Sequence, residues 1–227
     1  MDGVIVLDKP AGMTSARSVD AVKRLLPRGT KIGHAGTLDR FATGVLLLLV
    51  GRATKQCERL MDQPKTYQAT IKFGAITATD DPESPEEPLG SGVVQPVTRE
   101  AIEATLPRFV GRILQRPPVF SALKIAGKRA ADRVRAGQHV EMEPRKVSVY
   151  SIDVDEYTWP LLKLTIDCGR GTYIRSIARD VGEALLVGGY LTELRRTRIG
   201  TFTIDRAITL ECLATQGVAG ALLPPPG

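Results

Sequence analysis

One carboxylate, Asp39, stands alone in a glycine-rich segment of the sequence, Gly33-His-Ala-Gly-Thr-Leu-Asp-Arg-Phe-Ala-Thr-Gly-Val45. It is the only acid between Asp20 and Glu58. Glycine lets a backbone turn sharply or approach a ligand closely, and the apolar run at 45–50 predicts a buried strand that supports the loop. A carboxylate held still can act as a nucleophile or a general base. The alternative is a turn aspartate that caps local amides.

A second segment with chemical potential is Cys168-Gly-Arg-Gly-Thr-Tyr-Ile-Arg-Ser-Ile-Ala-Arg-Asp180. Its two glycines predict a tight turn after a strand, which presents Tyr173 and Arg175 near a helix N-terminus. We expect Arg175 to meet Asp39, because a guanidinium keeps a carboxylate ionised and fixes its direction. An ordinary ion pair is one alternative. A phosphate-binding loop is another, although the motif is short and lacks a following Lys-Ser/Thr pair.

Basic residues are concentrated between Arg108 and Lys146, where ten cations and three acids give 10 − 3 = +7. Apolar and aromatic residues at 117–127 interrupt the cations, as on nucleic-acid-binding surfaces; a solvated helical face is the alternative. The acidic stretch at 80–87 predicts a surface loop that repels a polyanion. Three cations in Leu194-Arg-Arg-Thr-Arg198 suit either phosphate contacts or an edge strand protected from aggregation.

The whole chain has 227 residues, 43% of them hydrophobic, and a formal charge of +6. This is enough for a folded core, and the charge favours an anionic partner such as nucleic acid. The three cysteines have no CxxC spacing, which argues against a disulfide framework and for a reducing, cytoplasmic location. With only two histidines, we expect no metal site. The longest apolar run is too short for a membrane span.

Periodicity predicts a mixed α/β domain. Strands are expected at 4–7, 45–50, 67–73, 147–154, 161–168, 191–196 and 201–204. Helices are expected at 19–26, with Ser15 as the N-cap, at 53–61, from Thr98 onward, at 176–186 and at 209–215.

The motifs together resemble the bacterial tRNA pseudouridine-55 synthases from about Gly3 to about Leu213. Besides the Asp39 segment with Ala42-Thr-Gly44, the matching motifs follow the family's order: Leu7-Asp-Lys-Pro-Ala-Gly-Met-Thr-Ser15, Lys65-Thr-Tyr67, Phe120-Ser-Ala-Leu-Lys124, Gly171-Thr-Tyr-Ile-Arg175 and Leu194-Arg-Arg196. The chain differs at Arg40, where proline is common, and at Phe120, where tyrosine is frequent. Ala130 and Ala131 also stand where an aromatic residue is common.

The resemblance implies a catalytic Asp39, a Tyr67 that stacks on the target base, an Arg175 paired with Asp39, and a pocket closed by Tyr173 and Leu194. His34 would contact the T-loop. The remaining substrate contacts implied are cationic: Lys9, Lys55, Lys124, Lys128, Arg129 and Arg196.

The fold implied is α+β (mixed α/β), with a central mixed, largely antiparallel sheet flanked by helices. We expect a catalytic domain at 1–215 with a thumb-like RNA-clasping insertion at about 113–146, a short tail at 216–227, and no C-terminal domain of the PUA kind.

The activity implied is isomerisation of the T-loop uridine at tRNA position 55 to pseudouridine, which requires a flipped base but no cofactor or metal. The expected partner is the T-arm of tRNA, with no membrane, no obligatory protein partner and a monomeric state. The alternatives are a non-catalytic tRNA-binding or tRNA-folding protein on the same core and a nucleotide-phosphate enzyme. RNA-guided relatives are a further possibility within the family.

Overall fold

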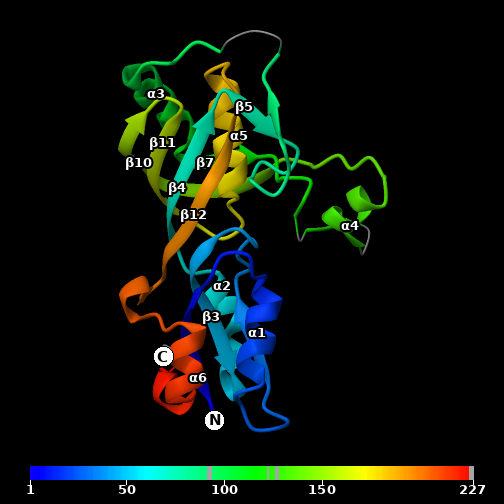
Figure 1. The fold of residues 1–227 in the computed structure, drawn as a ribbon, viewed down its shortest axis with the longest axis vertical. Helices are drawn as coiled ribbons and strands as arrows, with labels where there is room; N and C mark the ends of the chain where they lie inside the picture. The colour runs from blue at the N-terminus through cyan, green and yellow to red at the C-terminus, as the bar shows by residue number, and fades with distance from the viewer. Residues whose placement is uncertain (91–93, 122, 126–127, 225–227) are drawn as a thin grey trace. The chain divides into compact units, whose positions relative to one another are not determined.

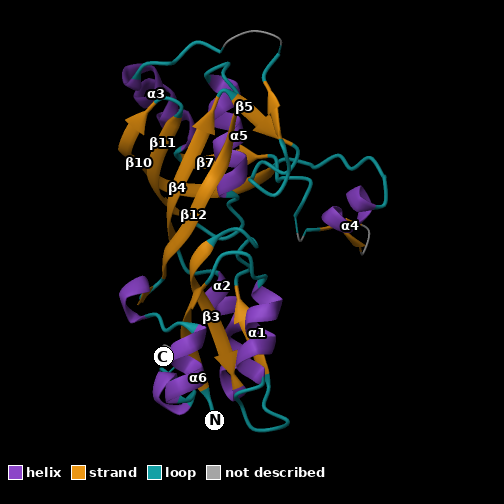
Figure 2. Ribbon diagram, in the orientation of Figure 1, coloured by secondary structure: helices purple, strands orange, loops and turns teal. Residues whose placement is uncertain are grey.

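The computed structural model describes residues 1–90, 94–121, 123–125 and 128–224. The chain divides into two compact units, Met1–Gln68 with Glu193–Gly227, and Ala69–Thr192. The boundary falls within two strands, β4 (Lys65–Phe73) and β12 (Gly189–Ile199), which contribute to both units. Figure 1 follows the chain by colour, and Figure 2 distinguishes its helices from its strands.

The first unit is built around β3 (Thr43–Val50). The strands β1 (Gly3–Lys9) and β2 (Ile32–Ala35) pair with it antiparallel, while β12 pairs with it in parallel and β13 (Phe202–Thr203) pairs with β12 antiparallel. The helices are α1 (Ser15–Lys23), α2 (Cys57–Met61) and α6 (Leu210–Gln216), with 3-10 turns at Gly51–Gln56, Ile204–Arg206 and Ala219–Ala221.

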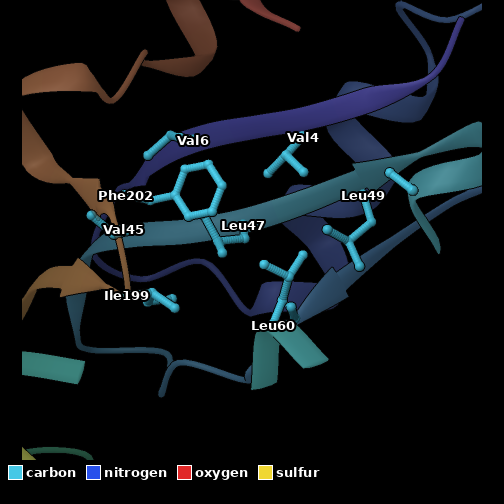
Figure 3. Packing of buried hydrophobic residues seen from close by; sticks show 10 residues of the cluster. Val4, Val6, Val45, Leu47, Leu49, Leu60, Ile199 and Phe202 are labelled. Carbon is cyan, nitrogen blue, oxygen red and sulfur yellow. The ribbon is translucent and has the colours of Figure 1, made fainter. Parts of the chain in front are cut away.

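The strand β3 is buried on both faces, which explains its uninterrupted apolar sequence. Val45, Leu47 and Leu49 belong to a cluster that also holds Leu60 and Phe202 (Figure 3). The alternate residues Leu46, Leu48 and Val50 belong to a second cluster, with Val22 of α1 and Leu213 of α6. Successive side chains of a strand point to opposite faces, so a strand covered on both sides reads as a near-continuous apolar run, as residues 45–50 do. The Asp39 loop therefore precedes a rigid strand.

The second unit contains parts of β4 and β12, followed in the sheet by β11 (Leu161–Cys168), β10 (Arg145–Thr158) and β7 (Gly111–Gln115). The pairs β10–β11 and β10–β7 are antiparallel. Its helices are α3 (Arg99–Thr105), α5 (Ile174–Ala184) and α4 (Ala130–Arg135), with a 3-10 turn at Leu106–Phe109. A hairpin joins β5 (Ala75–Thr77) to β6 (Glu86–Pro88). The mixed, largely antiparallel architecture confirms the predicted fold class.

The predicted insertion contains a small hairpin, β8 (Lys124–Ile125) with β9 (Lys128–Arg129), followed by α4. A separate apolar cluster of Ala130, Val140 and Met142 lies in this segment. Residues 122, 126 and 127 of the predicted basic segment lie outside the described residues. The bounds of the insertion and of the catalytic domain remain predictions.

Several local predictions need correction. The N-cap of α1 is Thr14, whose side chain accepts from Arg17 N, and not Ser15. The expected helix at 53–61 begins as a 3-10 turn and becomes α-helical only at Cys57. The expected strand at 201–204 is reduced to two residues before another 3-10 turn. In the part of the chain that the structure describes, no helix is both long and apolar enough to cross a bilayer.

Candidate active site and its positioning contacts

The loop that carries Asp39 follows β2 and is held through its backbone by buried donors. Arg196 Nη2 donates to Gly36 O at 3.0 Å, and Arg196 Nη1 approaches Thr37 O at 3.4 Å. The Ser15 hydroxyl accepts from Leu38 N at 2.9 Å and donates to Leu38 O at 3.1 Å. These contacts fix the three residues that precede Asp39.

The far side of Asp39 is held as well. Lys9 is fully buried, and its ammonium donates to Met13 O at 2.7 Å, Pro10 O at 2.8 Å and Arg40 O at 3.3 Å. Gly12 N donates to Arg40 O, and Arg40 Nε donates back to Gly12 O. Arginine at position 40 thus ties the Asp39 loop to the turn after β1. Asp39 itself is half-buried, on a loop whose flanking carbonyls have fixed donors.

Arg196 also reaches Tyr67, a buried residue of β4. The Arg196 Nη1 atom lies 3.4 Å from the Tyr67 hydroxyl, and the guanidinium carbon lies 5.9 Å from the ring centroid. Arg196 Nε donates to Val45 O at 2.7 Å. One guanidinium therefore joins the Asp39 loop, the start of β3 and the aromatic residue expected to stack on the base.

The close pairing of β3 and β12 requires glycine at position 44. Gly44 has φ +102 and lies opposite Arg196 in the parallel pair. A Cβ at this position would lie 2.2 Å from Arg196 O, and L-residues with side chains rarely adopt this φ. Gly44 therefore allows the backbone of Arg196 to approach the end of the Asp39 loop.

These contacts change the roles of two residues expected to bind substrate. Lys9 and Arg196 are 0% and 1% exposed. The Lys9 contacts described above are to loop carbonyls, and those of Arg196 are to loop carbonyls, Val45 O and the Tyr67 hydroxyl, so we assign both a positioning role. Of the two alternatives for Arg195, Arg196 and Arg198, the protected edge strand is wrong, because β12 has neighbours on both sides. Arg195 instead forms a forked ion pair with Asp8 at 2.8 and 3.2 Å.

Three other predicted site residues lie in the first unit. His34 is half-buried on β2; burial, with the positive charge of Arg196, lowers its pKa, so the imidazole is neutral at pH 7. Its Nδ1 is buried without a hydrogen-bond partner in the described residues. Leu194 is buried on β12. Lys55 is exposed and lines a surface pocket with Arg28, Lys31 and Arg52.

In the second unit, Arg175 is buried on α5, and its guanidinium contacts a carboxylate and backbone carbonyls. It forms an ion pair with Asp81 at 3.1 Å and donates to Thr79 O at 2.9 Å and Phe120 O at 3.1 Å. Asp81 is itself fixed, since its other oxygen accepts from the Thr79 hydroxyl at 2.5 Å and from Glu83 N at 2.9 Å. The prediction of an exposed acidic loop at 80–87 is wrong for Asp81, which is 2% exposed.

Tyr173 precedes α5, and the side chain of Gln115 holds its backbone. Gln115 Oε1 accepts from Tyr173 N at 2.8 Å, and Gln115 Nε2 donates to Tyr173 O at 3.1 Å. A small pocket of this unit is lined by Tyr173 and cations, among them Arg145, Lys146 and Arg170. For Lys124, Lys128 and Arg129 the structure describes only the backbone, in β8 and β9; their side chains lie outside the described part.

No group of three or more His, Cys, Asp and Glu residues suitable for holding a metal ion is found among the described residues. Sequence reasoning missed Ser15 and Asp81 as positioning residues. A hydroxyl that reaches 23 residues along the chain, or a carboxylate that reaches 94, leaves no local pattern in the sequence.

Comparison with known proteins identifies the family. The family model for the TruB family pseudouridylate synthase N-terminal domain matches residues 23–174, and that for the tRNA pseudouridylate synthase B C-terminal domain matches residues 175–220. The chain is 46% identical to the tRNA pseudouridine synthase B of Ralstonia pickettii, covering 98% of this chain and 71% of the relative. It is 45% identical to that of Corynebacterium diphtheriae, covering 93% and 72%.

Solved structures agree with this relationship. A chain in the crystal structure of a Cbf5-Nop10-Gar1 complex is 31% identical, with a TM-score of 0.73 over 98% of this chain and 60% of that one. A chain in an H/ACA RNP bound to a substrate RNA containing 2'-deoxyuridine is 28% identical, with a TM-score of 0.69 over 96% and 56%. The protein thus spans less than two thirds of the length of these solved chains. It belongs to the TruB family of pseudouridylate synthases.

Proposed function

We propose that the protein isomerises the T-loop uridine at position 55 of tRNA to pseudouridine. The observation that carries the proposal is the set of buried donors on the carbonyls at 36, 37, 38 and 40, which hold the Asp39 loop on both sides of its carboxylate. Preorganisation of this kind is what a reaction driven by one side chain needs. Membership of a family of pseudouridylate synthases supports the same assignment.

The proposed chemistry conserves every atom of the uridine. The C1′–N1 glycosidic bond breaks, the uracil turns within the pocket, C5 bonds to C1′, and the proton lost from C5 is balanced by a proton gained at N1. Asp39 attacks as a nucleophile or removes a proton, and both roles need its ionised form. Tyr67 stacks on the flipped base, Arg175 pairs with Asp39, and Tyr173 and Leu194 close the pocket. No cofactor is required.

The proposed substrate is the T-arm of tRNA, with His34 at the T-loop and Lys55, Lys124, Lys128 and Arg129 at phosphates. Phosphate contacts of this kind position an RNA without reading its sequence. A tRNA substrate favours the cytoplasm as the place of action, and we propose a monomer that needs no protein partner. A protein that only binds tRNA, or a nucleotide-phosphate enzyme, would not need the Asp39 carboxylate to be held in a fixed position.

The test is to incubate purified protein with unmodified tRNA transcript and map pseudouridine at single-nucleotide resolution. We expect one modified position, uridine 55, and no product in a transcript with cytidine there. Pseudouridine only at other uridines would overturn the proposed specificity. No pseudouridine at any position would overturn the proposed reaction.

A further inference from the structure

Helix α5 presents two arginines one turn apart, Arg175 and Arg179. Residues four apart lie on the same face of a helix, and both side chains reach the same two segments of the second unit. These segments are the turn at 79–81 and the stretch at 116–120 that follows β7. Arg175 contacts Thr79 O and Phe120 O. Arg179 contacts Asp80 and Arg116 O.

The guanidinium of Arg179 contacts Asp80, Asp180 and Arg116 O, and its Nε lies 4.0 Å from Glu183 Oε1. Nη1 donates to Asp80 Oδ2 at 3.1 Å, Nε donates to Asp180 Oδ1 at 2.9 Å, and Nη2 donates to Arg116 O at 2.8 Å. The planar fork of donors of a guanidinium can reach several partners from one fixed group. Arg179 therefore joins α5, the turn at 79–81 and the exit of β7.

The turn at 79–81 is the structure that fixes Arg175. It supplies the carbonyl of Thr79 and the carboxylate of Asp81, and Asp80 lies between them. Asp80 O also accepts from Leu191 N of β12 at 3.2 Å. A shift of Asp80 moves both neighbours, and with them the groups that hold the Arg175 guanidinium.

This arrangement is unfavourable for folding by itself. Asp80 adopts φ 57, in the left-handed region that residues with side chains rarely occupy. Burial also raises its pKa to about 6, against the opposing effect of Arg179 and Arg175, while the charge of Asp180 raises it further. Strained backbones and buried charges of this kind concentrate at functional sites.

We propose that Arg179, with Asp80 as its counter-ion, is a positioning residue that holds the turn at 79–81 against α5 and so orients Arg175 for the reaction. This inference rests on the proposed function, in which Arg175 acts with Asp39. Because Arg179 and Arg175 share one helix, the movement that Arg179 prevents is that of the turn at 79–81 relative to α5. Asp80 keeps the turn in place through its contact with Arg179, and loss of that contact loosens the turn.

The test compares Arg179→Gln and Asp80→Asn with the parent and with Arg99→Gln, a control that removes an exposed ion pair with Glu103 on α3. Single-turnover rates of pseudouridine formation and tRNA Kd are measured for all four proteins. Misplacement of an essential group by about 1 Å costs up to about 10²-fold in rate. We expect Arg179→Gln to be slower by about tenfold or more, with a Kd within about threefold of the parent.

The comparison of rate with affinity separates this role from a merely structural one. Asp80→Asn should also be slow, with a Kd close to that of the parent. Arg99→Gln should follow the parent in both rate and Kd. If Arg179→Gln does not fold, Asp80→Asn still decides the question.

If the parent is active and both Arg179→Gln and Asp80→Asn have rates within about twofold of it, this inference is overturned while the proposed function stands. A loss of tRNA affinity in both variants as large as the loss of rate would also overturn it. A parent that forms no pseudouridine would instead overturn the proposed function on which the inference rests.

Discussion

The Arg196 guanidinium lies against Tyr67, with Nη1 3.4 Å from the phenol oxygen and the guanidinium carbon 5.9 Å from the ring centroid. The same group donates to Gly36 O and Val45 O. A buried cation is unfavourable unless its donors are satisfied, and here the carbonyls of the Asp39 loop satisfy them. Folding of the first unit thus fixes the loop and the aromatic residue together.

Arg196→Lys is expected to lower stability and turnover, since one ammonium cannot serve carbonyls on opposite sides of a planar fork. Leaving buried carbonyls unsatisfied costs about 1–3 kcal/mol. Urea unfolding measures this loss. Arg195→Lys is the matched control, because the Arg195–Asp8 pair is partly exposed and such pairs contribute about 1 kcal/mol or less. Equal losses in the two variants would contradict the assigned role of Arg196.

Ser15→Ala removes a buried hydroxyl that both accepts from and donates to the backbone of Leu38. We expect kcat to fall with little change in tRNA affinity, because the loop beside Asp39 loses its fixed position. Ser18→Ala is the control, since Ser18 is equally buried on α1 but bonds only to Thr14 O within its own helix turn. Steady-state kinetics of both variants would expose the difference, and a similar kcat in the two would argue against a role for Ser15 in the loop.

The stability of Asp80→Asn relative to the parent should depend on pH. The folded-state pKa of Asp80 is raised from 3.8 to about 6 by burial, so ionisation opposes folding. The cost is absent below about pH 4, grows between pH 4 and 6, and is constant above; it amounts to roughly 3 kcal/mol at most. Unfolding free energies at pH 4 and 7 should therefore favour Asp80→Asn more at pH 7. A difference independent of pH would refute this.

The basic insertion should contribute to RNA binding through phosphates. Replacing Lys124, Lys128, Arg129 and Arg133 by Gln should reduce the slope of log affinity against log salt concentration by about 3. Each phosphate contact contributes roughly 0.7 to 0.9 to that slope. KM should rise more than kcat falls. Titrations of tRNA at several salt concentrations test this. An unchanged slope would mean that the basic segment is a solvated surface that does not contact the RNA.

The parts of the fold predicted from sequence are those with a strong local pattern. The buried strand at 45–50 and the helix capped by Thr98 are present, because periodicity and capping act over a few residues. The burial of Arg196 was not predictable, since three cations in a short run are typical of a surface. Successive side chains of β12 point to opposite faces of the sheet, and the face that carries Arg196 is buried. Gly44 makes room for the Arg196 backbone.

Ion-pair partners were the hardest part of the site to predict. Asp80 and Asp81 stand in an acidic, proline-containing stretch that reads as exposed, yet they are the partners of Arg179 and Arg175. The spacing of the two arginines on one helix face was a usable signal. The turn that receives them lies about 95 residues earlier in the chain, so nothing in the local sequence links the two.

The central claim is that the Asp39 carboxylate carries out the reaction on a loop preorganised by folding. The most direct test is the single-turnover rate of Asp39→Asn on tRNA, measured with its tRNA Kd and beside Asp20→Asn, an exposed acid of α1. The account predicts a loss of at least about 10³-fold in rate with a Kd close to that of the parent, and no loss in Asp20→Asn. Pseudouridine formation by Asp39→Asn near the parent rate would contradict it.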